Sequence, residues 1–339
     1  MPAEWKTNGN IAAKFTDSNG VIQIGSMNEA NYVDYANFLN EFVTYLSDNG
    51  VKLDAISIQN EPDMEVTYAG CIWTPAQMAK FIAKYGRTIN CKIIAPESVG
   101  IENSFATAFL PENVSAKFDI FAGHQYGNLE TGFSSLQAKG HDSWMTEYLI
   151  NWNEDEKTTR DFNRAKDGFT FATKLNTALV SNINAWIHYA SKHYYEMMGD
   201  GTNGTTNGIM TKRGYILSHY AKYTTGATRI KNTWADDSGL LSGSSYLSVT
   251  GDSVIVMVIN SSGNSYSLTT DLPFYTISGN CISTTETLSM FNSPIEFSAE
   301  TPRPKVNVVP LSVTTFIFKK SSERVTSQMT GAVFHHNKI

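Results

Sequence analysis

The segment LDAISIQNEP, Leu53 to Pro62, decides the fold. It is a short apolar run with an abrupt polar end, which is typical of a buried parallel strand. Before it, residues 28–50 place aromatic and aliphatic side chains at three- and four-residue spacing and then stop at Asn-Gly, as an amphipathic helix does. After it, Thr74 and Pro75 form a typical N-cap and first helical residue. The order helix, strand, helix predicts successive βα units.

The same pattern continues along the first two thirds of the chain. Further apolar runs with polar ends are CKIIAPES, FDIFAGHQYG, HDSWMTEY and INAWIHYA, and residues 162–180 read as a helix. The predicted strands start near residues 53, 91, 118, 142 and 183, which are 24 to 41 residues apart, the size of βα units. Polar residues end every strand, and in a (β/α) barrel these ends form the face that carries active sites. We therefore expect an α/β fold of the TIM-barrel type.

From about Arg229 the pattern changes to alternating apolar and polar residues with Gly-containing turns, which predicts an antiparallel β domain. We accordingly divide the chain into a barrel domain at 1–227, a side β domain at 228–320 and a tail extension at 321–339. The tail SSERVTSQMTGAVFHHNKI has no clear period. Its His335 and His336 are expected to be solvated rather than to bind a metal.

Composition excludes some classes of protein. The 26 basic and 32 acidic residues leave a formal charge of −6, which argues against binding to nucleic acid or to an anionic membrane. No apolar run reaches the roughly 18 residues of a membrane span, and the first ten residues lack a signal-like apolar core. The three cysteines suit free thiols, although a Cys71–Cys91 bridge stays possible. No cofactor and no metal are expected.

Glu61 and Glu147 are the candidate catalytic pair. Each ends a predicted strand without a nearby Lys or Arg in the sequence, and 86 residues separate them. Cleavage of a glycosidic bond needs two carboxyl groups that flank one sugar linkage. The alternative is that each is a structural acid that caps a helix or accepts backbone hydrogen bonds. Two acids on the same predicted face, with aromatic neighbours, favour catalysis.

Two segments that contain these acids, AISIQNEPDMEVTYAGCIWTPAQM and SWMTEY, resemble the acid/base and nucleophile segments of glycoside hydrolase family 30, closest to its xylanase branch. PAEWKTNG, APES, HQYG and TKRGYILSHYAKYTTGATRI resemble further segments of that family in the same order, from residue 2 to about 320. The resemblance implies a (β/α)8 barrel with a side β-sandwich. It also implies a secreted, retaining endo-β-1,4-xylanase that acts on the polysaccharide xylan.

The resemblance implies roles for individual residues. Glu61 would be the acid/base, protonated at the working pH, and Glu147 the ionised nucleophile, with the two carboxyl groups about 5–5.5 Å apart. Asn60 would hydrogen-bond the sugar 2-hydroxyl. His124 and Tyr126 are expected to supply hydrogen bonds to the carboxyl groups, although packing at a strand end would also explain them.

Aromatic side chains near these segments offer flat faces for sugar rings. Trp5 and Trp73 are the favoured contacts, and Trp144 and Tyr148 are further candidates. Each could instead pack the mouth of the barrel. Trp186 lies inside an apolar run, where a role in the core is the alternative.

The sequence departs from the family pattern in the loop that follows the last predicted barrel strand. The branch that cuts glucuronoxylan reads a glucuronic acid side group with an arginine here, but Tyr189 to Gly208 contains none. Lys192 and His193 cannot reproduce the fork of a guanidinium group. We therefore expect weak or no dependence on glucuronic acid.

A second departure lies at the front, because Met1 opens almost inside the family's PAEWKTNG segment. The first two βα units and the third strand are therefore expected to be missing, which would leave open sheet edges suited to self-association. Two alternatives stay open. One is a β-glucosidase, β-xylosidase or β-1,6-glucanase of the same family, and the other is a poorly active or non-catalytic carbohydrate-binding remnant.

Overall fold

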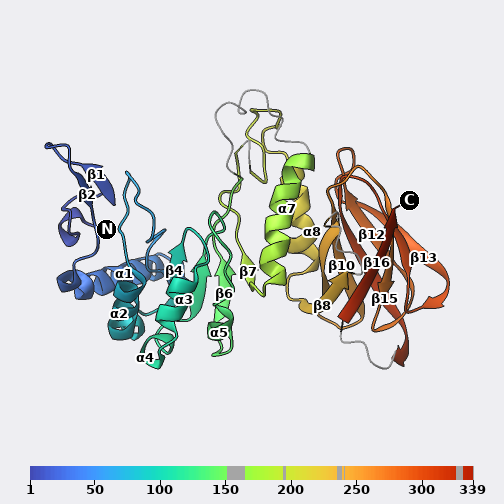
Figure 1. Ribbon diagram of the computed structural model, residues 1–339, viewed down its shortest axis with the longest axis horizontal. Helices are drawn as coiled ribbons and strands as arrows, with labels where there is room; N and C mark the ends of the chain where they lie inside the picture. Colours follow the sequence, from blue (N-terminus) through green and yellow to red (C-terminus); the bar gives the residue numbers. More distant parts are fainter. Residues whose placement is uncertain (151–164, 194–195, 235–238, 240, 326–330, 339) are drawn as a thin grey trace. The chain divides into compact units, whose positions relative to one another are not determined.

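The computed structural model describes residues 1–150, 165–193, 196–234, 239, 241–325 and 331–338 (Figure 1). The chain forms two compact units. The first contains Met1–Tyr148 and Ser181–His188, and the second contains Leu149–Val180 and Tyr189–Ile339. These units divide the chain differently from the predicted boundary at residues 227 and 228, which stays a prediction.

The first unit is built on a parallel sheet with the order β3-β4-β5-β6-β7, which curls into a half-barrel (Figure 1). Its strands confirm the five predicted ones: β3 (Ala55–Ser57), β4 (Lys92–Ser98), β5 (Ile120–Gly123), β6 (Asp142–Met145) and β7 (Ala185–Trp186). Every neighbouring pair is parallel. β3 and β7 are the edge strands of this sheet, and self-association through these edges stays a prediction.

Helices connect the parallel strands, as the repeated strand-to-helix pattern predicts. Thr74 caps α2 as expected: its hydroxyl accepts the Gln77 N–H at 3.2 Å, while the Gln77 side chain accepts the Thr74 N–H at 2.9 Å. A small antiparallel hairpin precedes α1. The elements are η1 (Ala3–Trp5), β1 (Lys14–Thr16), β2 (Ile22–Ile24), η2 (Glu29–Asn31), α1 (Tyr32–Asp48), α2 (Pro75–Tyr85), η3 (Gly86–Thr88), α3 (Asn103–Phe109), α4 (Glu112–Ser115) and α5 (Ser134–Gln137).

Lys6 ties the segment before α1 to the loop that follows β3. Its ammonium group is buried and donates to the carbonyl oxygens of Ala12 at 3.2 Å and Gly70 at 2.9 Å. The neighbouring Cys71 is a free thiol, as is Cys91, so the bridge between them that the sequence left possible is not formed. Burial raises the pKa of Cys71 to about 12, although the positive charge of Lys6 opposes the rise.

Trp73 is a core residue, which corrects its assignment to sugar contact. Its side chain is only 1% exposed, stacks on Tyr32 at a ring distance of 5.4 Å, and meets Phe81 edge-on at 5.6 Å. The ring thus fills the space between α1 and α2. The sequence misled because an aromatic residue beside a helix start is equally typical of core packing and of a binding surface.

The second unit combines two packed helices with antiparallel strands. Its helices are α7 (Ala165–Val180) and α8 (Lys212–Tyr223), and residues 162–164 of the predicted helix lie outside the described residues. The strands confirm the predicted antiparallel β structure: β8 (Thr228–Trp234), β9 (Leu241–Leu247), β10 (Ser253–Asn260), β11 (Tyr266–Asp271), β12 (Phe274–Thr284), β13 (Phe291–Thr301), β14 (Lys305–Val308) and β15 (Ser312–Val325).

Part of the predicted tail belongs to these strands. Residues 321–325 continue β15, and Gly331–Lys338 form β16 between β8, which it pairs in parallel, and β11, which it pairs antiparallel. The strand order is β13-β12-β15-β10-β9-β8-β16-β11-β14. Backbone hydrogen bonds to the two neighbouring strands, β8 and β11, can hold a strand in place even when its sequence does not alternate apolar and polar residues. The sequence pattern therefore did not predict β16.

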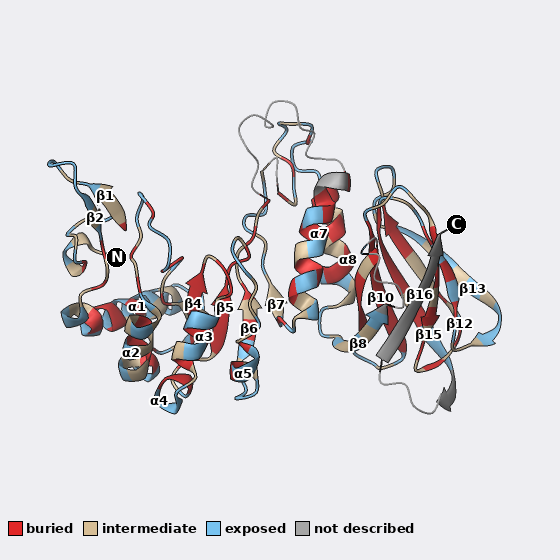
Figure 2. Ribbon diagram, viewed as in Figure 1, coloured by how far each residue is buried: buried red, intermediate tan, exposed pale blue. Residues whose placement is uncertain are grey.

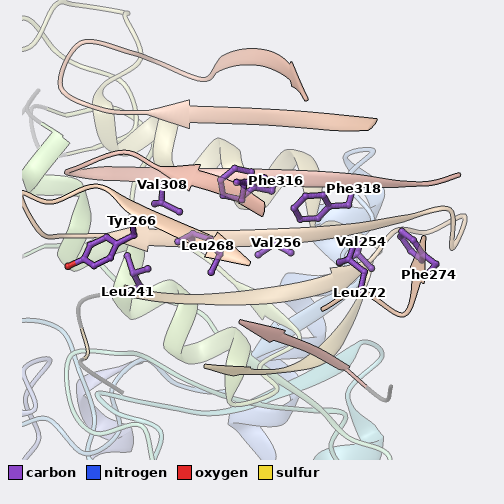
Figure 3. Close-up of a cluster of buried hydrophobic side chains, with 12 residues drawn as sticks. Leu241, Val254, Val256, Tyr266, Leu268, Leu272, Phe274, Val308, Phe316 and Phe318 are labelled. Atoms are coloured by element: carbon purple, nitrogen blue, oxygen red, sulfur yellow. The ribbon is translucent and has the colours of Figure 1, made fainter. Parts of the chain in front are cut away.

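The apolar core of the second unit lies among these strands (Figure 3). β10 is buried along its length, whereas β13 at the end of the order is mostly exposed (Figure 2). The core consists of Leu241, Val254, Val256, Val258, Tyr266, Leu268, Leu272, Phe274, Val306, Val308, Phe316 and Phe318. Among the described residues of both units, no helix combines the length and hydropathy that a membrane crossing requires.

His219 joins α8 to two strands. Its Nδ1 lies 2.7 Å from the Thr315 hydroxyl on β15, and its Nε2 lies 2.9 Å from the Thr284 hydroxyl on β12. Burial lowers the pKa of His219 to about 3 from an ordinary value of 6.5, since a buried imidazole resists charging. The ring is therefore neutral at neutral pH.

This pKa makes a prediction about acid stability. Between pH 6.5 and about 3 the unfolded chain binds a proton at His219 and the folded chain does not, so the free energy of unfolding falls as the pH drops through this window. We expect wild type to lose up to about 1.4 kcal/mol per pH unit more than a His219→Gln variant. Urea titrations from pH 7.5 to 4 measure both slopes, and equal slopes would contradict the assignment.

The core position of Trp73 makes a second prediction. Trp73→Ala should lower the free energy of unfolding by about 3–5 kcal/mol, because it empties a filled space between helices. Trp5→Ala, at a partly exposed ring, is the comparison and should cost less. Urea denaturation of both variants decides the matter: if Trp73→Ala kept the wild-type midpoint, the core assignment would be wrong.

Candidate active site

A pocket of about 360 Å³ opens where β3, β4, β5 and β6 end. Each strand delivers a polar side chain to it, as the polar ends of the predicted strands indicated. Glu97, Glu147 and His124 belong to its wall, and Glu61 lies directly behind His124, with its Oε1 3.1 Å from the ring Nδ1. The remaining lining residues are Met1, Tyr35, Phe38, Ser57, Ile58, Gln59, Asn60 and Thr146.

Glu61 follows β3 with a φ of 46°, in the left-handed region that non-glycine residues seldom adopt. Its N–H donates to the carbonyl of Glu97 at 2.8 Å, which joins the ends of two adjacent strands. Glu97 itself has a φ of 64°. Two neighbouring strands thus end in strained acidic residues, and strain of this kind gathers at functional sites.

Glu147 follows β6 and is the more accessible of the two candidate catalytic acids. Its side chain is 24% exposed, against 9% for Glu61. The hydroxyl of Tyr126 donates to Glu147 Oε1 at 3.1 Å, and the N–H of Gln125 donates to the Glu147 carbonyl at 3.2 Å. The segment after β5 therefore holds both the backbone and the carboxyl group of Glu147.

His124 stands among all three acids. Its Nδ1 lies 3.1 Å from Glu61 Oε1, while its Nε2 lies 3.9 Å from both Glu97 Oε2 and Glu147 Oε2. The ring is buried, and burial by itself would lower the pKa of His124. The hydrogen bond to Glu61 and the negative charges of Glu147, Glu97 and Glu61 outweigh burial and raise that pKa.

The ends of the parallel strands bring Glu61 and Glu147 together across 86 residues of sequence. One oxygen of each and one ring nitrogen of His124 lie within 4.8 Å of one another. Such a spacing allows both carboxyl groups to reach one small group between them. Two carboxylates and an imidazole are also donors that a divalent cation accepts, so the expected absence of a metal remains a prediction that chelation can test.

Glu97 is the acid of the pocket that was not among the predicted site residues. Hydroxyls of Ser57 and Thr146 donate to its two carboxyl oxygens, from the ends of β3 and β6. Burial raises the pKa of Glu97, and these hydrogen bonds and the nearby His124 oppose the rise. The signal for Glu97 was present in the sequence, because it ends the predicted strand CKIIAPES.

Among the expected sugar-binding residues, Asn60 is exposed and lines the pocket beside Glu61. Trp5 is partly buried and is not among the lining residues; it meets Tyr35 and Phe38 edge-on, at ring distances of 6.4 and 6.2 Å. Tyr35 and Phe38 themselves line the pocket from α1. Their helical spacing marked them only as core residues, so nothing in the sequence pointed to this role.

Trp144 and Tyr148 also lie outside the pocket wall. Trp144 packs on the cluster of Ile94, Ile120 and Ala122 within the sheet, which favours the packing alternative. Tyr148 is 6% exposed and lies between the rings of Tyr126 and Trp186, each 5.9 Å away. This burial corrects the expectation of direct sugar contact: Tyr148 supports the ring of Tyr126, whose hydroxyl reaches Glu147.

Comparisons with curated proteins find glucuronoxylanases that are similar to part of this chain. No family model matches the chain. The glucuronoxylanase XynC of Bacillus subtilis strain 168 is 32% identical over 199 residues, which cover 57% of this chain and 44% of that enzyme. A second XynC from Bacillus subtilis is 28% identical over 198 residues, with the same coverage. The match thus spans less than half the length of these curated relatives.

Solved structures extend the likeness over nearly the whole chain. A glycoside hydrolase family 30 subfamily 8 xylanase from Clostridium acetobutylicum matches with a TM-score of 0.77 and 26% identity. The match covers 94% of this chain and 77% of the xylanase chain. An endoxylanase of that family from Clostridium papyrosolvens C71 shares the fold with a TM-score of 0.75 at 23% identity, over 93% and 78%. The chain is therefore similar in sequence and fold to these xylanases over the part of them that it spans.

Proposed function

We propose that this chain carries the catalytic pair of a retaining endo-β-1,4-xylanase, with Glu61 as acid/base and Glu147 as nucleophile. The single observation that supports the proposal most is the approach of a Glu61 oxygen and a Glu147 oxygen to within 4.8 Å at the ends of the parallel strands. Retaining glycosidases need a short separation, about 5–5.5 Å between carboxyl groups, because the nucleophile must reach the sugar carbon directly. Inverting enzymes need a wider gap that admits a water molecule.

In the first step, Glu61 gives its proton to the glycosidic oxygen while Glu147 attacks the anomeric carbon. The bond from that carbon to the leaving oxygen breaks, and a glycosyl ester of Glu147 forms. In the second step, Glu61 removes a proton from water, and the water oxygen displaces the Glu147 carboxylate. The two inversions at the anomeric carbon together retain its configuration.

The surroundings of the two acids suit these different proton states. Tyr126 donates its hydroxyl hydrogen to Glu147 at 3.1 Å, which stabilises a carboxylate rather than a neutral acid. Glu61 is nearly buried and has the ring of His124 at 3.1 Å, a partner that can exchange a hydrogen bond with either form. Glu61 can therefore lose and regain a proton without losing its partner.

Xylan is the proposed substrate, since the relatives named above are xylanases. Weak dependence on glucuronic acid is proposed because Tyr189 to Gly208 contains no arginine. Enzymes that degrade a polymer meet it outside the cell, so secretion is part of the proposal. A chain that binds sugar without cleaving it is the competing function.

The catalytic pair is tested with two variants. Glu147→Gln should lower kcat on linear xylan by about a thousandfold or more, because no carboxylate remains to form the ester. Glu61→Gln should also abolish cleavage of xylan, yet still release an activated aryl leaving group from a xyloside, since such a group departs without a proton. NMR of the first products should show the β anomer.

Glu65→Gln is the matched control, because Glu65 is half exposed, pairs with Lys14, and lies outside the pocket lining. It should keep the wild-type rate. A Glu147→Gln variant with full activity would overturn the assignment of the nucleophile, and loss of activity in EDTA would show that the acids hold a metal. Calorimetric binding of xylooligosaccharides by a wild-type chain that releases no reducing sugar would favour the binding function.

Specificity is tested with three substrates. Because the loop lacks an arginine that could pair with a carboxylate, kcat/KM on glucuronoxylan should lie within about threefold of the value on linear xylan and arabinoxylan. A time course of products from all three measures this ratio. A preference for glucuronoxylan of a hundredfold would mean that another side chain reads the glucuronate.

A further inference from the structure

We propose that Glu97 is a positioning residue for both catalytic acids: its main chain holds Glu61 and its carboxyl group aligns His124 between Glu61 and Glu147. The inference rests on the proposed function, because it assigns a part in that reaction to an acid that does not touch the sugar bond. The contacts that support this role join the ends of β3, β4, β5 and β6.

The first contact is between backbones. Glu61 stands at a φ of 46°, a conformation that is strained for a residue with a side chain unless its surroundings hold it. The Glu97 carbonyl accepts the Glu61 N–H at 2.8 Å and so supplies that support. Glu97 can present its carbonyl in this direction while its side chain enters the pocket because its own φ is 64°.

The second contact fixes the Glu97 carboxyl group. The Ser57 hydroxyl donates to Oε1 and the Thr146 hydroxyl donates to Oε2. Ser57 ends β3, four residues before Glu61, and Thr146 immediately precedes Glu147. The carboxyl group is therefore held from the same two segments that carry the catalytic acids, and a shift of either segment would move it.

The third contact is electrostatic. Glu97 Oε2 lies 3.9 Å from His124 Nε2, and Glu147 Oε2 lies at the same distance, while Glu61 faces Nδ1. The titratable groups around His124 are thus Glu61, Glu97, Glu147 and the Tyr126 phenol. Negative charge on Glu97 favours the protonated ring, which can donate a hydrogen bond to Glu61. The same charge raises the energy of deprotonating every neighbouring acid.

Glu97→Gln tests the inference because it keeps the size of the side chain and removes its charge. We expect kcat on xylan to fall about tenfold with KM within about twofold, since binding contacts are unchanged and alignment is lost. Both limbs of the pH profile of kcat should move to lower pH by about one unit, because protons leave a less negative cluster more readily. A role confined to folding would move neither limb.

An activity-independent readout separates this inference from the proposed function. NMR titration of the His124 ring, assigned by the loss of its signals in His124→Gln, should give a lower midpoint in Glu97→Gln than in wild type. If wild type cleaves no xylan but the midpoint moves, the function fails and the coupling of Glu97 to His124 stands. If wild type is active and both the midpoint and kcat match in Glu97→Gln, the inference is overturned.

One control variant and two further test variants complete the experiment. Glu112, at the start of α4 and outside the pocket, has an exposed carboxylate that pairs with Lys139. Glu112→Gln should leave the rate, the pH profile and the His124 midpoint unchanged. Ser57→Ala and Thr146→Val each remove one hydroxyl donor of Glu97 and make its negative form less favourable. Both should move the pH profile in the same direction as Glu97→Gln, and a shift to higher pH would contradict the inference.

Discussion

The contact between His124 Nδ1 and Glu61 Oε1, at 3.1 Å, is the interaction on which the site depends. It links the end of β5 to the end of β3, and the far side of the same ring faces Glu97 and Glu147. Without a side chain here that can take up a positive charge, three buried or partly buried carboxyl groups would lie close together. The repulsion between their negative charges would then cost free energy. A histidine can carry a proton there or release it, so the cluster can change its charge during a reaction.

The parallel sheet makes this arrangement possible. Parallel strands end at the same edge, so residues that are far apart in sequence meet there if each strand has the right length and register. Ile56 pairs with Ile93, Ala95 with Phe121, and Ala122 with Trp144, and these registers bring the strand ends level. The half-barrel of five described strands is thus sufficient to bring the two catalytic candidates together.

Features that depend on neighbours in sequence were predicted correctly, and features that depend on distant segments were not. The five parallel strands, the α2 cap at Thr74 and the antiparallel unit followed from local patterns, because periodicity and capping depend on neighbours in sequence. Trp73 was predicted wrongly and Glu97 was overlooked, because burial depends on what other segments place around a side chain. β16 was missed because its place in the sheet comes from backbone pairing with distant strands.

The sequence by itself determined the class of fold, the positions of the strand ends and the two acids, Glu61 and Glu147, that those ends present. These properties are local, and the resemblance to family 30 added the role of each acid. Only the tertiary structure decided that one oxygen of each acid lies within 4.8 Å of the other, that His124 stands between them, and that Glu97 completes the cluster. Such distances result from register and packing between strands separated by tens of residues, which no local pattern encodes.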